Sequence, residues 1–128
     1  MTDTEKVSFN MSVVDLGKVD LLVKQGHYSN RTDFFITSVR NLLITHAPAV
    51  QEAVTRQFMM VGVTTYNREM LERMRTKRQQ LDARVVGVVV ISKDVTPELA
   101  RATIKSLQVY GTLRASPTVK EALKDRML

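Results

Sequence analysis

The chain has 128 residues, of which 44% are hydrophobic and 25% charged, values typical of one or two small globular domains. It contains no cysteine, which excludes disulfides, cysteine–zinc sites and thiol catalysis. No apolar run approaches the ~18–20 residues needed to span a bilayer, and the polar, acidic start MTDTEKVSF is unlike a signal peptide. We therefore expect no membrane partner and a cytoplasmic location.

The net charge of +6 is unevenly distributed along the chain. Residues 1–47 contain five basic and five acidic side chains, so this part is neutral. Residues 48–128 contain 14 basic and 8 acidic side chains and carry the whole excess. An excess of positive charge favours an anionic partner. Because the excess lies in residues 48–128, this part is the better candidate for such an interaction.

The first element predicted in chain order is a short strand. In KVSFNMS (residues 6–12), Val7, Phe9 and Met11 alternate with polar side chains, which is the period-2 pattern of a half-buried strand. Helix-like sequence follows directly, and no second strand lies nearby in the chain. This strand therefore needs a pairing partner from elsewhere.

Two helices should follow the strand. Ser12-Val13-Val14-Asp15 has the pattern of a capping box, and Gly26 is a natural left-handed stop for the helix after it. The second helix should begin at Ser29 or Asn30, with Asp33 in its first turn. Its apolar residues cover more than half of its surface, so a unit of about 45 residues cannot bury them alone.

The rest of the sequence alternates between strand and helix patterns. Ala47-Pro48-Ala49 indicates a break and residues 48–56 a linker. Beyond it we expect strands at 57–66, 84–91 and 106–115, and helices at 67–80, from Thr96-Pro97 through Ile104, and from Ser116-Pro117. The two cap-plus-proline starts hint at a degenerate repeat. The predicted fold class is α+β, with domains at 1–47 and 57–128, the second a small α/β domain.

The order of the first three elements resembles the ribbon-helix-helix DNA-binding family. The resemblance covers roughly residues 5–46 and is carried by KVSFNMS, DLGKVDLLVKQG and, most specifically, GHYSNRTDFFITSVRNLL. It implies a homodimer in which each strand pairs with its twofold mate and the two-stranded ribbon enters the major groove of double-stranded DNA. Val7, Phe9 and Met11 would then point into a shared core.

The resemblance also implies site residues. Lys6, Ser8 and Asn10 would face the base edges, where lysine and asparagine can read guanine and adenine. The start of the second helix would present backbone N–H groups at Ser29, Asn30 and Arg31 to a phosphate. Such phosphate contacts position the protein on the duplex without reading its sequence.

A basic run in the second domain allows two interpretations. Arg73, Arg75, Lys77 and Arg78 could form an auxiliary nucleic-acid surface. They could instead be the solvated face of a helix, which is the interpretation that we favour.

Metal-dependent and enzymatic functions find little support in the sequence. One branch of the family senses nickel through histidines and a cysteine in its C-terminal domain, but His27 and His46 both lie in the N-terminal part here. The sequence contains no glycine-rich phosphate loop and no histidine spaced with a carboxylate and a nucleophile. We therefore expect no metal, no cofactor and no catalysis.

The resemblance to the ribbon-helix-helix family implies a sequence-specific transcriptional regulator that acts as a repressor. Its C-terminal domain would serve oligomerisation or regulation, and could join dimers into higher assemblies. The alternatives are a partner-binding, antitoxin-like protein and a structural assembly protein in which the C-terminal domain drives oligomerisation.

Overall fold

The structure is a computed structural model that describes residues 4–128, so the first three residues of the predicted domain at 1–47 lie outside the described part. The described residues divide into two compact units, Thr4–Glu52 and Ala53–Leu128. Together they contain six α-helices, a short 3-10 helix and a three-stranded sheet. The mixed helix-and-strand class predicted from the sequence is confirmed. Within residues 4–128, no helix is both long enough and apolar enough to cross a membrane.

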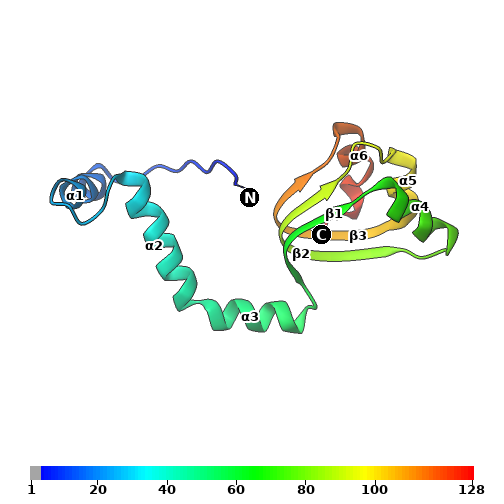
Figure 1. Ribbon diagram of the computed structural model, residues 1–128, viewed down its shortest axis with the longest axis horizontal. Helices are drawn as coiled ribbons and strands as arrows, with labels where there is room; N and C mark the ends of the chain where they lie inside the picture. The colour runs from blue at the N-terminus through cyan, green and yellow to red at the C-terminus, as the bar shows by residue number, and fades with distance from the viewer. Residues whose placement is uncertain (1–3) are drawn as a thin grey trace. The chain divides into compact units, whose positions relative to one another are not determined.

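The N-terminal unit is built from α1 (Val13–Lys24) and α2 (Arg31–Thr45), shown in blue and cyan in Figure 1. The predicted cap of α1 is confirmed, because the Ser12 hydroxyl accepts the Asp15 N–H at 3.5 Å. Gly26 follows α1 with φ +86°, a left-handed conformation that glycine adopts without steric cost. The turn between the helices therefore follows from the sequence.

Residues 6–12 form no strand in the structure, contrary to the sequence prediction. This segment makes no β-ladder with any other described part of the same chain. A strand is assigned only where the backbone forms hydrogen bonds with a neighbouring strand. The alternating pattern of residues 6–12 predicts which side chains would share a face, but it does not provide such a neighbour.

The predicted linker at 48–56 is instead helical. The break after α2 falls at His46, and α3 (Ala47–Arg56) begins directly after it. Proline is tolerated in the first turn of a helix, since the N–H that it lacks would have no partner there. Pro48 therefore marks the start of a helix and not an irregular connection.

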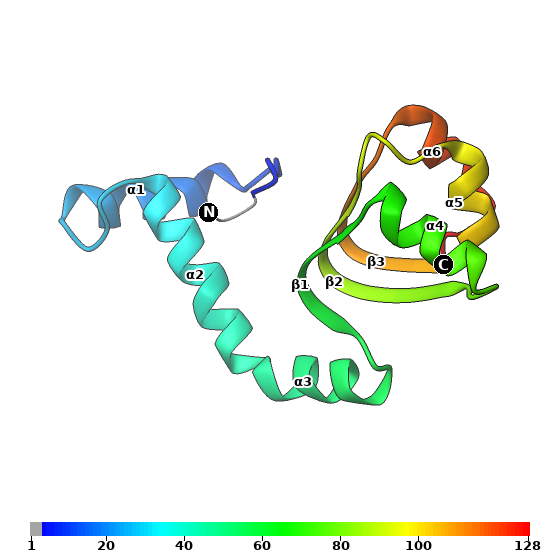
Figure 2. The same cartoon turned by 45° about the vertical axis from the view of Figure 1, so that its right-hand side comes forward.

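The C-terminal unit alternates strands and helices as predicted. Its elements are β1 (Met60–Tyr66), α4 (Arg68–Thr76), β2 (Leu81–Ile91), α5 (Pro97–Thr103), β3 (Ile104–Arg114), α6 (Pro117–Ala122) and η1 (Lys124–Arg126). All strands are parallel, in the order β1-β2-β3. Figures 1 and 2 show the strands bending around the helices, which cover one face of the sheet.

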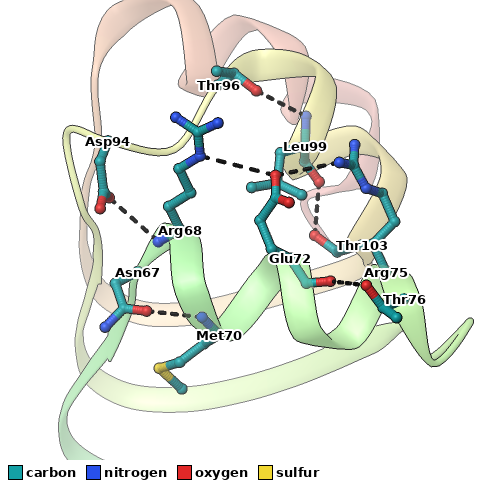
Figure 3. Close-up of polar contacts among 10 residues, drawn as sticks. All are labelled: Asn67, Arg68, Met70, Glu72, Arg75, Thr76, Asp94, Thr96, Leu99 and Thr103. Carbon is teal, nitrogen blue, oxygen red and sulfur yellow. Dashed lines mark hydrogen bonds and ion pairs between the residues drawn. The ribbon is translucent and has the colours of Figure 1, made fainter.

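The helix starts in this unit match the sequence more closely than the helix ends. The side chains of Asn67, Thr96 and Ser116 accept the N–H of the residue three positions on, and Figure 3 shows the first two caps. The predicted helix through Ile104 ends at Thr103, because Ile104 already pairs as the first residue of β3. The helix predicted at 67–80 similarly ends at Thr76, and the strand predicted from 57 starts at Met60.

The hydrophobic core lies between the sheet and its three helices. Leu71, Leu99 and Leu123 from α4, α5 and the end of α6 are almost fully buried against Val85, Val89 and Leu107 of the sheet. Burial alternates along β2, so one face of this strand contacts the helices and the other does not. The core is therefore one-sided.

Three glycines cross the sheet in register. Gly62 pairs with Gly87, and Gly87 with Gly111, at intervals of 25 and 24 residues. All three have φ between +125° and +137°. A Cβ on Gly87 would meet the carbonyl oxygen of Gly62 at 2.1 Å, and one on Gly111 would meet that of Gly87 at 2.0 Å. This glycine ladder therefore places the same close backbone contact between each pair of neighbouring strands.

Candidate nucleic-acid interface

The N-terminal unit exposes most of its apolar side chains. Among its described residues Val19 is the only one that is buried, at 4% exposure. The exposed apolar residues come from the predicted strand and from both helices: Val7, Phe9, Met11, Val13, Val14, Leu21, Ile36, Val39, Leu42, Leu43 and Ile44. Monomeric soluble proteins usually expose apolar side chains singly, whereas here many are exposed on one small unit. Such an exposed apolar surface indicates a face that associates with another molecule.

Aromatic contacts connect the predicted strand to α2. The ring of Phe9 meets the edge of Phe35 with the centroids 5.6 Å apart, and Phe35 in turn contacts Phe34 at 5.8 Å. Tyr28, from the turn before α2, contacts Phe34 at 5.0 Å. Edge-to-face pairs at these distances are favourable. They place the apolar side of residues 6–12 on α2.

Both sides of the same segment are exposed in this chain. Lys6, Ser8 and Asn10, the predicted base-contacting residues, are all exposed. They alternate with Val7, Phe9 and Met11, so the segment has one polar and one apolar side. An open hollow of about 660 Å³ lies along it, lined by residues 7–11 together with Leu16, Arg31 and Phe35.

The start of α2 is capped by Asn30. The Asn30 side-chain oxygen accepts the Asp33 N–H at 2.8 Å, and the Asp33 carboxylate accepts the Ser29 N–H at 2.9 Å. Of the two caps that the sequence allowed, the structure therefore selects Asn30. The Ser29 N–H, one of three predicted phosphate donors, already has an acceptor in this structure.

Arg31, the third predicted phosphate contact, pairs with a residue that sequence reasoning did not identify. Its guanidinium donates two hydrogen bonds of 2.8 Å to the Asp20 carboxylate of α1. The hydrogen bonds from Arg31 lower the pKa of Asp20, and those to Asp20 raise the pKa of Arg31. The two residues are 11 positions apart, and only the turn at Gly26 brings them together.

The basic run of the C-terminal unit is partly neutralised by its own helix. Arg73 pairs with Glu69 at 3.0 Å and Arg75 with Glu72 at 3.2 Å, all exposed side chains. Figure 3 shows Arg68 and Arg75 reaching Glu72 from opposite sides. Lys77 caps the end of α4 and Arg78 follows in a left-handed conformation. The four predicted residues are thus exposed but do not form a single cationic face.

The residues considered for metal binding remain apart. His27 lies in the exposed turn after α1, and His46 caps the end of α2. Among residues 4–128, no group of three or more histidine and acidic side chains is arranged to hold a metal ion.

The exposed apolar face of the N-terminal unit agrees with what a comparison with protein families found. The model of the ribbon-helix-helix transcriptional regulator family matches residues 2–120. The chain belongs to this family. Ribbon-helix-helix proteins are dimeric, DNA-binding transcriptional regulators. The match extends well beyond residues 5–46, where the sequence motifs lie, and includes the three strands of the sheet. Comparisons with curated proteins and with solved structures gave no match.

Proposed function

We propose that the protein is a sequence-specific DNA-binding repressor that acts as a homodimer. The observation that carries this proposal is the two-sided segment at residues 6–12, whose apolar side packs on α2 through Phe9 and Phe35. In a ribbon-helix-helix chain, this segment pairs with its twofold mate. The pairing satisfies the backbone groups that have no ladder partner within one chain.

The paired strands would present six polar side chains to the major groove. Lys6 donates to guanine O6 and N7, Asn10 makes a bidentate contact with adenine N6 and N7, and Ser8 donates or accepts. Each good base contact contributes about 1–3 kcal/mol of discrimination. Sequence specificity therefore resides in the ribbon.

The start of α2 would position the ribbon through phosphate contacts. The N–H groups of Asn30 and Arg31 lie at the positive end of the helix dipole, and the Ser29 hydroxyl precedes them. The N-terminal part has no excess charge, so these oriented donors would supply the attraction that lysine clusters provide elsewhere. Arg31 would contribute by moving from Asp20 to a phosphate.

The C-terminal unit would serve oligomerisation or regulation. Residues 48–128 carry the whole positive excess of the chain, which would favour DNA association whether or not Lys77 and Arg78 contact the duplex. Dimers joined through this unit would bind tandem half-sites cooperatively and block transcription by occlusion. We expect this to occur in the cytoplasm.

The proposal is tested by titrating the purified protein onto a labelled fragment from upstream of its own gene. Lys6→Ala and Asn10→Ala should each weaken specific binding about 10- to 100-fold while the dimer persists. Lys120→Ala, which removes an exposed charge from α6, is the matched control and should bind almost as well as the parent.

The salt dependence of binding completes the test. Specific binding should fall steeply with salt, with a slope that counts the contacted phosphates. An absence of binding to any fragment of a genomic pool at low salt would contradict the proposal. It would favour the alternative of an assembly or partner-binding protein, which the neutral N-terminal part supports.

A further inference from the structure

The two edges of the parallel sheet differ in how far other described residues cover them. At the β3 edge, Met127 forms a bridge with Leu107, and the Leu128 N–H donates to the Leu107 carbonyl at 3.0 Å. The end of the chain thus covers part of this edge. At the β1 edge, no described residue pairs with the outer side of the strand. β1 therefore leaves a row of backbone donors and acceptors without a ladder partner.

The residues of the β1 edge are unusually apolar for an exposed strand. Residues 57–67 contain no charged side chain. Phe58 is 90% exposed, and Met60, Val61 and Val63 are between 53% and 69% exposed. Soluble proteins protect edge strands with lysines, prolines or bulges to prevent association. β1 has none of these protections, which indicates that another strand covers it.

The two faces of β1 have different environments. Tyr66 is buried on the helix side, and strand alternation places Met60, Gly62 and Thr64 on that side as well. Val61, Val63 and Thr65 lie on the face that the helices leave uncovered. A Cβ on Gly62 would meet no atom within 4 Å, whereas Gly87 and Gly111 have a neighbouring backbone there. The edge has room for the backbone of an additional strand.

A second copy of this chain is the occupant that the rest of the molecule favours. Ribbon-helix-helix proteins dimerise through their N-terminal strands, so each C-terminal unit is tethered to an identical one. Tethering raises the effective concentration of the second unit to about the millimolar range, which a weak edge contact needs. A twofold axis brings the same edge of both copies together, and symmetric strand pairing is then antiparallel.

We propose that β1 pairs antiparallel with β1 of a second copy and joins the two sheets into one of six strands. Val61 and Val63 of both copies would meet on the face opposite the helices, as cross-strand apolar pairs. The β1 pairing would be a second twofold contact that fixes the spacing of the C-terminal units. This inference rests on the homodimer of the proposed function.

The absence of cysteine in the natural sequence makes site-specific cross-linking a direct test. Val61→Cys, Val63→Cys and Thr65→Cys would be made separately in the full chain and treated with a short-spacer bis-maleimide without DNA. At least one position should give a cross-linked dimer whose yield does not change on dilution, because the two units are tethered. Adding the Val61→Lys substitution to Val63→Cys should abolish that product.

Three controls separate the possible outcomes. Ser8→Cys reports the ribbon dimer, and Lys120→Cys on α6 reports random contact. Cross-linking through Ser8→Cys without cross-linking at any β1 position would overturn the inference and leave the ribbon dimer intact. Failure of Ser8→Cys would instead overturn the dimer of the proposed function. A product found only in mixtures of Val61→Cys with Tyr110→Cys would show end-to-end parallel stacking and replace the antiparallel arrangement.

Discussion

At the scale of single residues, Arg31, a proposed phosphate contact, forms an ion pair with Asp20. Both side chains are about half exposed, so their ion pair competes with water and contributes little stability. A phosphate offers Arg31 the same bidentate geometry as the Asp20 carboxylate. In the proposed complex, the ion pair would therefore have to open before the Arg31 guanidinium could contact a phosphate.

Removing the Asp20 charge should strengthen DNA binding. Asp20→Asn leaves Arg31 without its carboxylate partner, so we expect tighter binding at low salt and a salt slope steeper by about one phosphate contact. Salt titrations of both proteins on one DNA fragment measure this change. Asp15→Asn removes an equal charge from α1 without touching Arg31, and an identical gain in that control would contradict the specific role of the pair.

The same pair predicts a pH dependence with a defined sign. The pKa of Asp20 in the folded chain lies below its ordinary value of 3.8, because Arg31 donates hydrogen bonds to the carboxylate. Its contribution to stability is therefore complete above about pH 4 and is lost as the pH falls through the lowered pKa. Thermal unfolding should differ between the parent and Asp20→Asn above about pH 4, and the difference should shrink as the pH falls through the lowered pKa of Asp20.

The glycine ladder predicts a loss of stability at the same scale. Gly87→Ala should destabilise the C-terminal unit by more than about 3 kcal/mol, because the new Cβ would collide with the Gly62 carbonyl in a strained backbone conformation. Gly17→Ala is the matched control, since its Cβ has open space on a helix and should stabilise by about 0.5–1 kcal/mol. Urea unfolding monitored by circular dichroism compares the two, and equal stability would contradict the ladder.

At the scale of elements, the last residues of the chain hold α5, α6 and β3 together. The Arg126 guanidinium donates to the carbonyls of Arg101 and Ile104 at 2.5 and 2.7 Å. The Arg101 guanidinium donates to the Ala122 carbonyl and to Asp125, which lowers the pKa of that carboxyl. These bonds satisfy carbonyls at the ends of two helices that have no intrahelical partner.

Truncating Arg126 should therefore loosen this end of the sheet. We expect Arg126→Ala to cost about 1–3 kcal/mol, because the partly buried hydrogen bond to the Ile104 carbonyl and the exposed one to the Arg101 carbonyl are both lost. Lys124→Ala, an exposed substitution in the same 3-10 helix, should change the stability by less than about 0.5 kcal/mol. Hydrogen exchange at Leu128, whose N–H bonds to Leu107, would show whether the C-terminal end detaches.

Elements whose sequence patterns involve only neighbouring residues were predicted more accurately than those that depend on residues far apart in the chain. Ser12, Asn67, Thr96 and Ser116 cap helices as predicted, because a cap needs only a side chain and an N–H three residues on. The predicted helix ends were less accurate. The spacing of Ile104 fits a helix, but in the structure Ile104 pairs with Leu81 of β2 and belongs to β3. Pro48 suggested a break where the chain starts a new helix.

The candidate site could be predicted only in part, because some of its contacts join residues far apart in the sequence. The polar and apolar sides of residues 6–12 follow from alternation alone, and the contact of Phe9 with Phe35 agrees with the apolar side. Asp20 could not be found, because its pairing with Arg31 depends on how the turn orients two helices. The assignment of Lys6, Ser8, Asn10 and the α2 start to DNA stays a prediction.

At the scale of the whole molecule, the two units differ in how much core each holds. The C-terminal unit buries a continuous core between its sheet and helices. The N-terminal unit buries Val19 alone among its described residues. A helical pair with so little burial has too small a core to fold alone, so its stability should come from a second copy.

Dimerisation should therefore depend on the aromatic cluster of the N-terminal unit. Phe35→Ala removes the ring that contacts both Phe9 and Phe34, and should raise the concentration for half-dissociation at least about 10-fold. Sedimentation or light scattering over a dilution series measures the shift. Tyr110→Ala, which truncates an exposed ring of β3, should leave the midpoint unchanged, and equal effects would argue against the cluster.

The regular interval of the glycine ladder has a consequence for how such chains can change in length. Each strand and its following helix form one layer, joined to the next through the same glycine contact. Duplicating or deleting a segment of about 24 residues would add or remove one whole layer, about 4.8 Å wide, without disturbing the others. The width of the sheet can therefore change in fixed steps during evolution while the N-terminal unit stays the same.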